Sequence, residues 1–149
     1  MIFITVQEAI EDHAEIVNIF GGLPGTRDLG LLISALEMPK ASMFGEYLHP
    51  TIFDKAAAYL FHIVCNHPFL DGNKRTGTVM ALTFLRQNKV HIEFTEEQSR
   101  ELEELVVRTA ESKINKEQIA EFFRSCYTGP AFIEGKPGQI FNDETGKWD

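Results

Sequence analysis

Two long apolar segments constrain the fold of this chain more than any other feature. Residues 51–66 (TIFDKAAAYLFHIVCN) and residues 76–88 (TGTVMALTFLRQN) carry apolar side chains almost all the way round a helical projection. A helix that is apolar on every face must be covered on every face. The sequence therefore predicts an all-α fold with these two helices at its centre.

Four further helices are predicted from capping residues that precede apolar residues at helical spacing. The caps are Thr5, Asp28, Thr95 and Asn115, and both Thr5 with Glu8 and Thr95 with Gln98 have the spacing of a capping box. The side chains expected to be buried in the first two helices are Val6, Ala9, Ile10, Val17 and Phe20, followed by Leu29, Leu32, Ile33 and Leu36. Residues 89–95 alternate weakly and predict a short extended link.

Composition narrows the class of protein. The chain has 149 residues, 44% of them hydrophobic, which suits a single globular domain. Its net charge of −8 argues against direct nucleic-acid binding. Cys65 and Cys126 lack the spacing of a zinc site, and no secretion signal or membrane segment is visible. We expect a cytoplasmic protein that does not bind membranes.

The polar segment between the two central helices, residues 67–77 (HPFLDGNKRTG), has the pattern of an anion site. Pro68 ends the preceding helix near Asn66, and the next helix begins near Asn73. The free N–H groups at a helix start attract anions. Lys74 and Arg75 place two cations at the end of the helix where they are unfavourable unless an anion is present.

Two other residues of this segment suggest chemistry. Asp71 offers the single carboxylate that Mg²⁺ often takes from a protein when phosphates complete its shell, although a helix-capping role is the simpler alternative. His67 can accept a proton near neutral pH and so act as a general base, although a lone histidine is more often structural. Phe69 is expected in the core. The four other histidines (His13, His49, His62 and His91) share no metal-ligand spacing and are interpreted as structural or surface residues.

Residues 40–50 (KASMFGEYLHP) are predicted to form a loop or a short hairpin. Its apolar side chains, Met43, Phe44, Tyr47 and Leu48, either fold onto the core or form an edge that grips a partner segment by strand addition. The sequence does not separate these alternatives. After Thr128 the chain is rich in glycine and polar residues; this tail is either disordered or a small hairpin that pairs Phe141 with Trp148 through a turn at Gly146.

The stretch HPFLDGNKRTGT resembles the motif of the Fic/Doc family. The Fic branch has glycine and a second arginine at the positions of Lys74 and Thr78, whereas the Doc (death-on-curing) branch has lysine at the first position and lacks the second arginine. The resemblance extends over residues 1–127. It implies a compact helical bundle with a small β flap, a catalytic domain of residues 1–128 and an added tail of residues 129–149.

The resemblance also implies roles for individual residues. His67 would deprotonate a hydroxyl of a target protein, and Asp71 would hold Mg²⁺. Gly72, Asn73, Lys74 and Arg75 would bind the phosphates of ATP, with Lys74 and Arg75 also acting in catalysis. The flap that clamps the target would be Phe44, Gly45, Glu46, Tyr47 and Leu48.

By resemblance to Doc-type toxins, we expect a protein kinase that inhibits translation, a target such as a Tu-type elongation factor, and a cognate antitoxin as partner. AMP transfer on the same scaffold and a non-catalytic peptide-binding module are the alternatives. The family's inhibitory helix motif is absent: SRELEE, from Ser99, comes nearest but has Glu104 where glycine or asparagine belongs.

Overall fold

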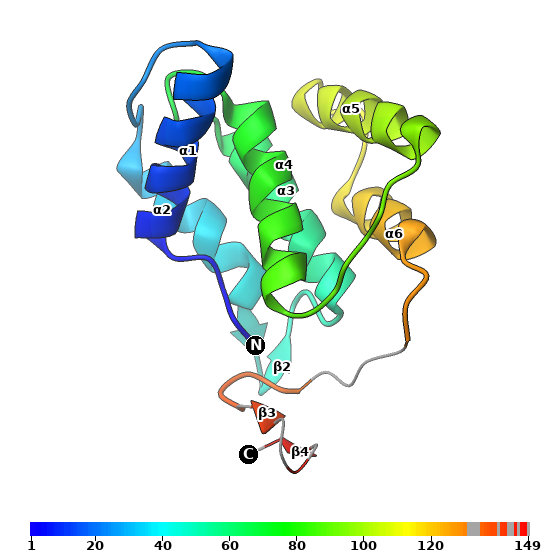
Figure 1. Ribbon diagram of the computed structural model, residues 1–149. Helices are drawn as coiled ribbons and strands as arrows, with labels where there is room; N and C mark the ends of the chain where they lie inside the picture. Colours follow the sequence, from blue (N-terminus) through cyan, green and yellow to red (C-terminus); the bar gives the residue numbers. More distant parts are fainter. Residues whose placement is uncertain (131–134, 140, 143–144, 146, 149) are drawn as a thin grey trace.

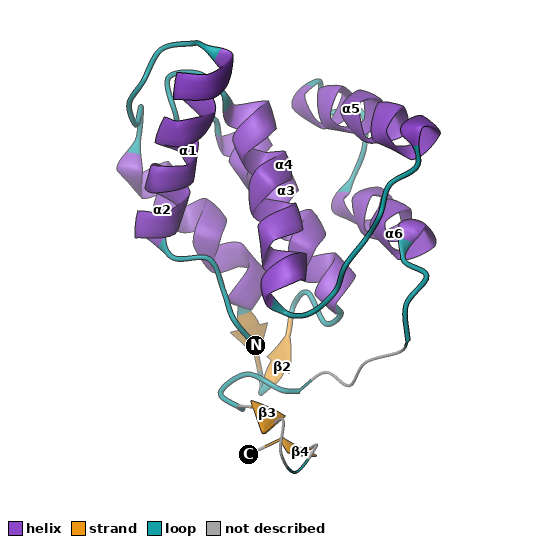
Figure 2. Ribbon diagram, viewed as in Figure 1, coloured by secondary structure: helices purple, strands orange, loops and turns teal. Residues whose placement is uncertain are grey.

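The computed structural model describes residues 1–130, 135–139, 141–142, 145 and 147–148. Within these residues the α-helices are α1 (Val6–Phe20), α2 (Leu29–Glu37), α3 (Ile52–Asn66), α4 (Asn73–Gln87), α5 (Glu96–Ala110) and α6 (Lys116–Cys126), with a 3-10 turn, η1 (Met38–Lys40), after α2. The expected all-α class is confirmed, and Figure 2 shows strands only in two short hairpins. Among the described helices, none combines the length and the apolar character needed to cross a bilayer.

Helices α3 and α4 form the centre of the fold, as the sequence predicts. Figure 1 shows α1 and α2 on one side of this pair and α5 and α6 on the other. Gly77 explains how closely the central helices approach: a Cβ there would lie 3.0 Å from Val64 Cγ2 and 3.2 Å from the Leu60 carbonyl oxygen. Any larger residue at position 77 would push α4 away from α3.

The outer helices begin at the predicted caps. Thr5, Asp28, Thr95 and Asn115 each accept a backbone N–H three residues ahead. The boxes at Thr95 and Asn115 are reciprocal, whereas only the Thr5 half of the predicted box with Glu8 is formed. The predicted buried faces are narrower than expected. Four side chains expected inside are exposed: Ile10, Phe20, Leu29 and Ile33. The predicted link at 89–95 contains no strand.

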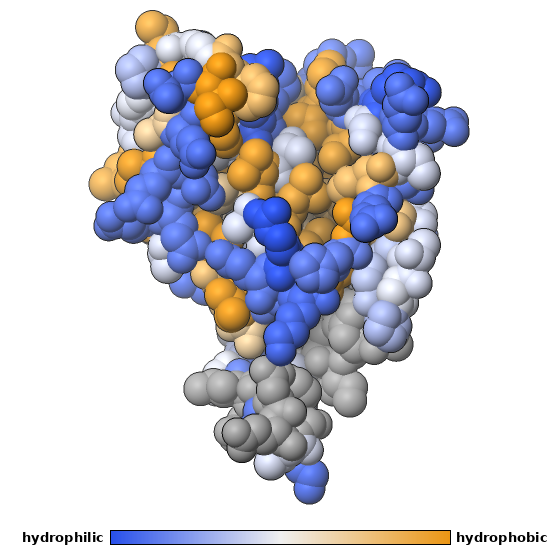
Figure 3. Space-filling model, in the orientation of Figure 1, coloured by the Kyte–Doolittle hydropathy of each residue, from blue (hydrophilic) through white to orange (hydrophobic). Residues whose placement is uncertain are grey.

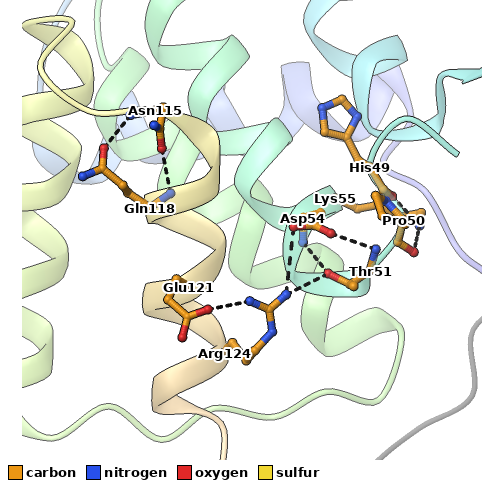
Figure 4. Close-up of polar contacts among 9 residues, drawn as sticks. All are labelled: His49, Pro50, Thr51, Asp54, Lys55, Asn115, Gln118, Glu121 and Arg124. Carbon is orange, nitrogen blue, oxygen red and sulfur yellow. Dashed lines mark hydrogen bonds and ion pairs between the residues drawn. The ribbon is translucent and has the colours of Figure 1, made fainter.

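The N-terminal end of α3 is anchored by polar contacts (Figure 4). Thr51 and Asp54 form a reciprocal capping box. The ammonium of Lys55, which is fully buried, donates to the carbonyls of His49 and Pro50 at 2.8 and 3.0 Å. Arg124 of α6 reaches the Thr51 hydroxyl at 3.3 Å and so ties the two helices together.

The predicted hairpin at residues 40–50 is present, as β1 (Ser42–Met43) and β2 (Glu46–Tyr47), paired antiparallel. Phe44 at its tip is 97% exposed, and Met43 and Leu48 are exposed as well. The alternative in which these side chains fold onto the core is therefore wrong for three of the four.

The C-terminal segment also contains a hairpin. Strands β3 (Phe141–Asn142) and β4 (Lys147–Trp148) are antiparallel, and Phe141 pairs with Trp148 as the sequence suggested. The expected turn residue Gly146 lies outside the described residues. An ion pair of 3.3 Å joins Lys136 to Glu46 of the first hairpin.

Candidate active site

The segment between α3 and α4 is framed by two residues in the left-handed conformation. His67 follows α3 with φ 52° and ψ 54°, and Gly72 precedes α4 with φ 76° and ψ 18°. Both helix boundaries lie where the sequence predicts them. No side chain caps α4, so its first N–H groups remain available to an anion.

Phe69 and Asn73 hold the interior of this loop. Phe69 is fully buried, as expected, and its backbone N–H and carbonyl both bond to the side-chain amide of Asn73 at 2.9 and 3.0 Å. The Asn73 side chain is buried and engaged in these bonds. The backbone N–H of Asn73, at the uncapped start of α4, is therefore the group that best suits the phosphate-binding role predicted for this residue.

Asp71 is not the cap of α4, because Gly72 occupies that position. Its Oδ1 accepts the Gly72 N–H at 2.9 Å, and its Oδ2 accepts the Leu23 N–H at 3.3 Å. A Cβ at Gly22 would lie 2.8 Å from Oδ2, and Gly22 has a φ of 119°, a conformation that residues with a Cβ rarely adopt. A carboxylate has about four acceptor positions, so Asp71 retains capacity for a metal ion.

Helix α1 supports the loop through a residue that sequence reasoning placed only among the structural or surface histidines. His13 is 3% exposed, and its Nε2 lies 2.8 Å from the Asp71 carbonyl oxygen. Its ring stacks on Phe69 with centroids 3.8 Å apart. The place of His13 on the buried face of α1, next to Ala9 and Val17, was the available clue.

The loop opens into a cavity of about 880 Å³ that brings His67, Asp71, Lys74 and Arg75 together. Among the described residues, neither Lys74 nor Arg75 forms an ion pair. The Arg75 guanidinium lies over the ring of Phe20, with its Cζ 4.4 Å from the ring centroid. Two cations therefore stand at the start of α4 without a protein anion to neutralise them.

The rest of the cavity is mainly apolar. Figure 3 shows apolar side chains gathered in the hollow between α4 and α5. The apolar lining from α4, α5 and the link between them consists of Val79, Leu82, Phe94, Leu102, Val106, Val107 and Ala110. Ser99 and Glu103 add polar groups to the α5 wall, one turn apart. The cavity thus has a cationic end and an apolar end.

The hairpin that was expected to act as the flap does not line this cavity. It leads into the N-terminal end of α3, whereas His67 follows the C-terminal end. Fifteen residues of α-helix separate them, which is about 22 Å. Figure 1 shows this separation along α3.

The magnesium site predicted from the sequence would rest on one carboxylate, that of Asp71. Among the described residues there is no group of three or more histidine, cysteine, aspartate or glutamate side chains that could enclose an ion. Mg²⁺ commonly binds one or two protein carboxylates and fills its remaining positions with water and substrate phosphate. Asp71 beside an uncapped helix start fits that pattern.

Fold and site together define a class: a mainly helical protein that presents to one cavity an uncapped helix N-terminus, a histidine, and two cations that form no ion pair within the described part of the chain. The sequence model of the Fic/DOC family matches residues 3–85. "Toxin Doc" of Mycolicibacterium smegmatis is 36% identical over 113 residues, covering 74% of this chain and 87% of that protein. "Protein kinase doc" of Escherichia phage P1 is 33% identical over 124 residues, covering 83% and 94%. The chain belongs to the Fic/DOC family.

Proposed function

We propose that this protein is a Doc-type toxin that transfers the γ-phosphoryl group of ATP to a hydroxyl of a target protein in the cytoplasm, with a Tu-type translation elongation factor as the target class. The observation that carries the proposal is the cavity in which an uncapped helix start, two unpaired cations and His67 meet. The names of the two relatives support the toxin and kinase assignments.

The cavity suits a nucleotide in one orientation. Its cationic end, with the N–H groups of α4 and the side chains of Lys74 and Arg75, matches a triphosphate. Its apolar end between α4 and α5 matches a planar base. Mg²⁺ held by Asp71 and the phosphates would neutralise charge at the transferred group.

The histidine supplies the proton chemistry. The hydroxyl oxygen of the target attacks the γ-phosphorus while its proton passes to the imidazole of His67. The bond from the γ-phosphorus to the bridging oxygen breaks, ADP leaves with that electron pair, and His67 returns its proton to water. Among the described residues the His67 imidazole has no hydrogen-bond partner, so it is free to take this proton.

The choice of γ-phosphoryl rather than AMP transfer is supported by positions 74 and 78. Lys74 adds a point charge at the start of α4. Threonine is neutral, so position 78 offers no cation to a second phosphate. The Thr78 hydroxyl instead donates to the Lys74 carbonyl at 2.9 Å. AMP transfer and a non-catalytic peptide-binding module are the two alternatives.

The hairpin at β1 and β2 can still bind the target, but at a distance. An extended segment advances about 3.3 Å per residue, so about seven residues would span the length of α3. We propose that the hairpin, through Phe44 to Leu48, grips the target some distance from the hydroxyl that reacts. A cognate antitoxin is the proposed second partner.

ATP labelled at the α- or the γ-phosphate tests the reaction. The full-length protein is incubated with purified elongation factor and each label, with the His67→Ala variant as control. Label from the γ position on the factor is the expected result, and label from the α position indicates AMP transfer. If the factor carries no label from either position, the catalytic proposal for this target is overturned. A chain ending at Thr128 should retain the transfer, because every proposed catalytic residue precedes it.

A further inference from the structure

The backbone of His67 is held in an unfavourable conformation. A left-handed φ of 52° is uncommon for a residue with a Cβ. The proline at position 68 adds to the difficulty, because a residue before proline prefers extended backbone. Glycine would relieve the first cost but could not carry an imidazole. The His67 N–H bonds to the Ile63 carbonyl at 3.2 Å, as is common at the end of a helix, and a segment outside the loop adds further contacts.

Arg27, from the segment between α1 and α2, contacts this backbone. Its Nε donates to the His67 carbonyl at 2.7 Å, and one of its terminal nitrogens donates to the Asn66 carbonyl at 3.0 Å. Its backbone N–H donates to the Pro68 carbonyl at 2.7 Å. One residue therefore binds three successive carbonyls across the end of α3.

The rest of the same segment continues this pairing along the loop. Thr26 forms a β-bridge with Phe69, and the Leu70 N–H donates to the Gly25 carbonyl at 3.1 Å. The pairing makes the segment a fixed platform for the Arg27 side chain. A planar guanidinium holds its donors in a rigid fork, whereas an ammonium is a point charge on a flexible stem.

We infer that Arg27 is a positioning residue for His67: it fixes the left-handed backbone that points the imidazole into the cavity. The catalytic role of His67 rests on the proposed function, whereas the positioning of its backbone by Arg27 does not. Because the Arg27 side chain is exposed, its removal should disturb the loop more than the fold. The C-terminal end of the α3 dipole also favours a cation at that place.

The test compares the full-length protein with Arg27→Met, Arg27→Lys and, as a matched control, Arg108→Met. Arg108 is exposed on α5, pairs with Glu104 and lies outside the cavity. Histidine ring signals are recorded by NMR, with His67 assigned from its loss in His67→Ala and the exposed His91 as internal reference. Phosphoryl transfer and the KM for ATP are measured on the same proteins.

In Arg27→Met we expect the His67 signal to shift or split while His91 is unchanged, and kcat to fall about tenfold or more with the KM for ATP within about twofold. The His67 signal and the kcat of Arg27→Lys should lie between those of the parent and Arg27→Met. Both should equal the parent values in Arg108→Met. A His67 signal that does not change in Arg27→Met overturns the inference, as does a shift of His67 and His91 together. A parent without transfer refutes the proposed function alone, and the NMR comparison still decides the role of Arg27.

Discussion

The two ends of α3 use their charged groups in opposite ways. At the N-terminal end, Lys55 and Arg124 bond to carbonyls, a hydroxyl and carboxylates that hold the fold together. At the C-terminal end, Lys74 and Arg75 have no carboxylate partner among the described residues and face a cavity. Paired charges anchor a structure, whereas unpaired cations at a helix start are unfavourable without a ligand.

Backbone conformation shows the same contrast. Thr51 begins α3 in the extended conformation that a capping residue favours, and its box with Asp54 is complete. His67 ends α3 in a left-handed conformation, and its carbonyl accepts a hydrogen bond from Arg27 of a distant segment. Conformational strain of this kind concentrates at functional sites. Under the proposed function, one end of the helix serves stability and the other serves chemistry.

The largest effect is expected from His67→Ala. Loss of a general base should lower γ-phosphoryl transfer by roughly 10²- to 10⁴-fold. The thermal midpoint should stay close to that of the parent, because the imidazole is exposed and contributes nothing to the core. Labelled transfer and thermal unfolding measure the two quantities. His91→Ala, another exposed histidine, is the control, and equal transfer by parent and His67→Ala would remove the base assignment.

A pair of substitutions separates the two ends of α3. Lys74→Met should weaken ATP binding by about tenfold or more, since a hydrogen bond to a charged group contributes about 1.5–3 kcal/mol. It should not lower stability, because a cation at a helix start is unfavourable.

Arg124→Met is the matched control at the other end. It should leave ATP binding unchanged and lower stability by up to about 1 kcal/mol, or about 2–4 °C in the thermal midpoint. Calorimetry and thermal unfolding of both variants give the comparison. If Lys74→Met destabilises the fold while ATP affinity stays constant, the distinction between the two ends of α3 is lost.

Acidification should weaken the contacts of the start of α6 with α3 and with His49, which precedes α3. Lys116 Nζ lies 3.0 Å from His49 Nε2 and 3.1 Å from His62 Nε2. Burial, Lys116 and His49 lower the pKa of His62 to about 4, and burial followed by Lys116 lowers the pKa of His49. The unfolded chain, with ordinary histidine pKa values near 6.5, then binds more protons than the folded chain.

The stability that comes from the neutral imidazoles is therefore complete above pH 6.5 and is lost as the pH falls toward 4. Thermal midpoints measured from pH 7 to pH 5 should decline, and His62→Gln should flatten the decline. A midpoint that stays constant over this range in the parent would contradict the altered pKa values.

The sequence was sufficient for features that depend on neighbouring residues. Helix caps, the central position of α3 and α4, and the helix ends at Asn66 and Asn73 all follow from short patterns, and the structure confirms them. His13 and Arg27 were not identified because their partners lie 39 or more residues away. Periodicity gives a residue's face on a helix but not the element that packs there.

Burial was overestimated for the same reason. Helix α2 has nine residues and buries Leu32, Ala35 and Leu36, which leaves Leu29 and Ile33 exposed although they share its apolar stripe. Asn73 shows a second limit of prediction from sequence. Its residue type and position suit a phosphate site, but the bonds of its amide to Phe69 depend on the folded loop.

The smallest effect is expected at the hairpin tip, which is the exception at the N-terminal end of α3. Phe44 has a left-handed φ of 52° and Gly45 has φ 77°, the pattern of a two-residue type I′ turn. Asparagine followed by glycine is favoured in such turns, and Phe44 is exposed, so the phenylalanine gains little from folding. Phe44→Asn should therefore raise the free energy of unfolding by a few tenths to about 1 kcal/mol, measured by chemical denaturation.

If the hairpin grips the target as proposed, the same variant should lower kcat/KM for the target protein while leaving ATP binding unchanged. A loss of stability would show that Phe44 packs within the fold, and an unchanged kcat/KM would remove the hairpin from target recognition.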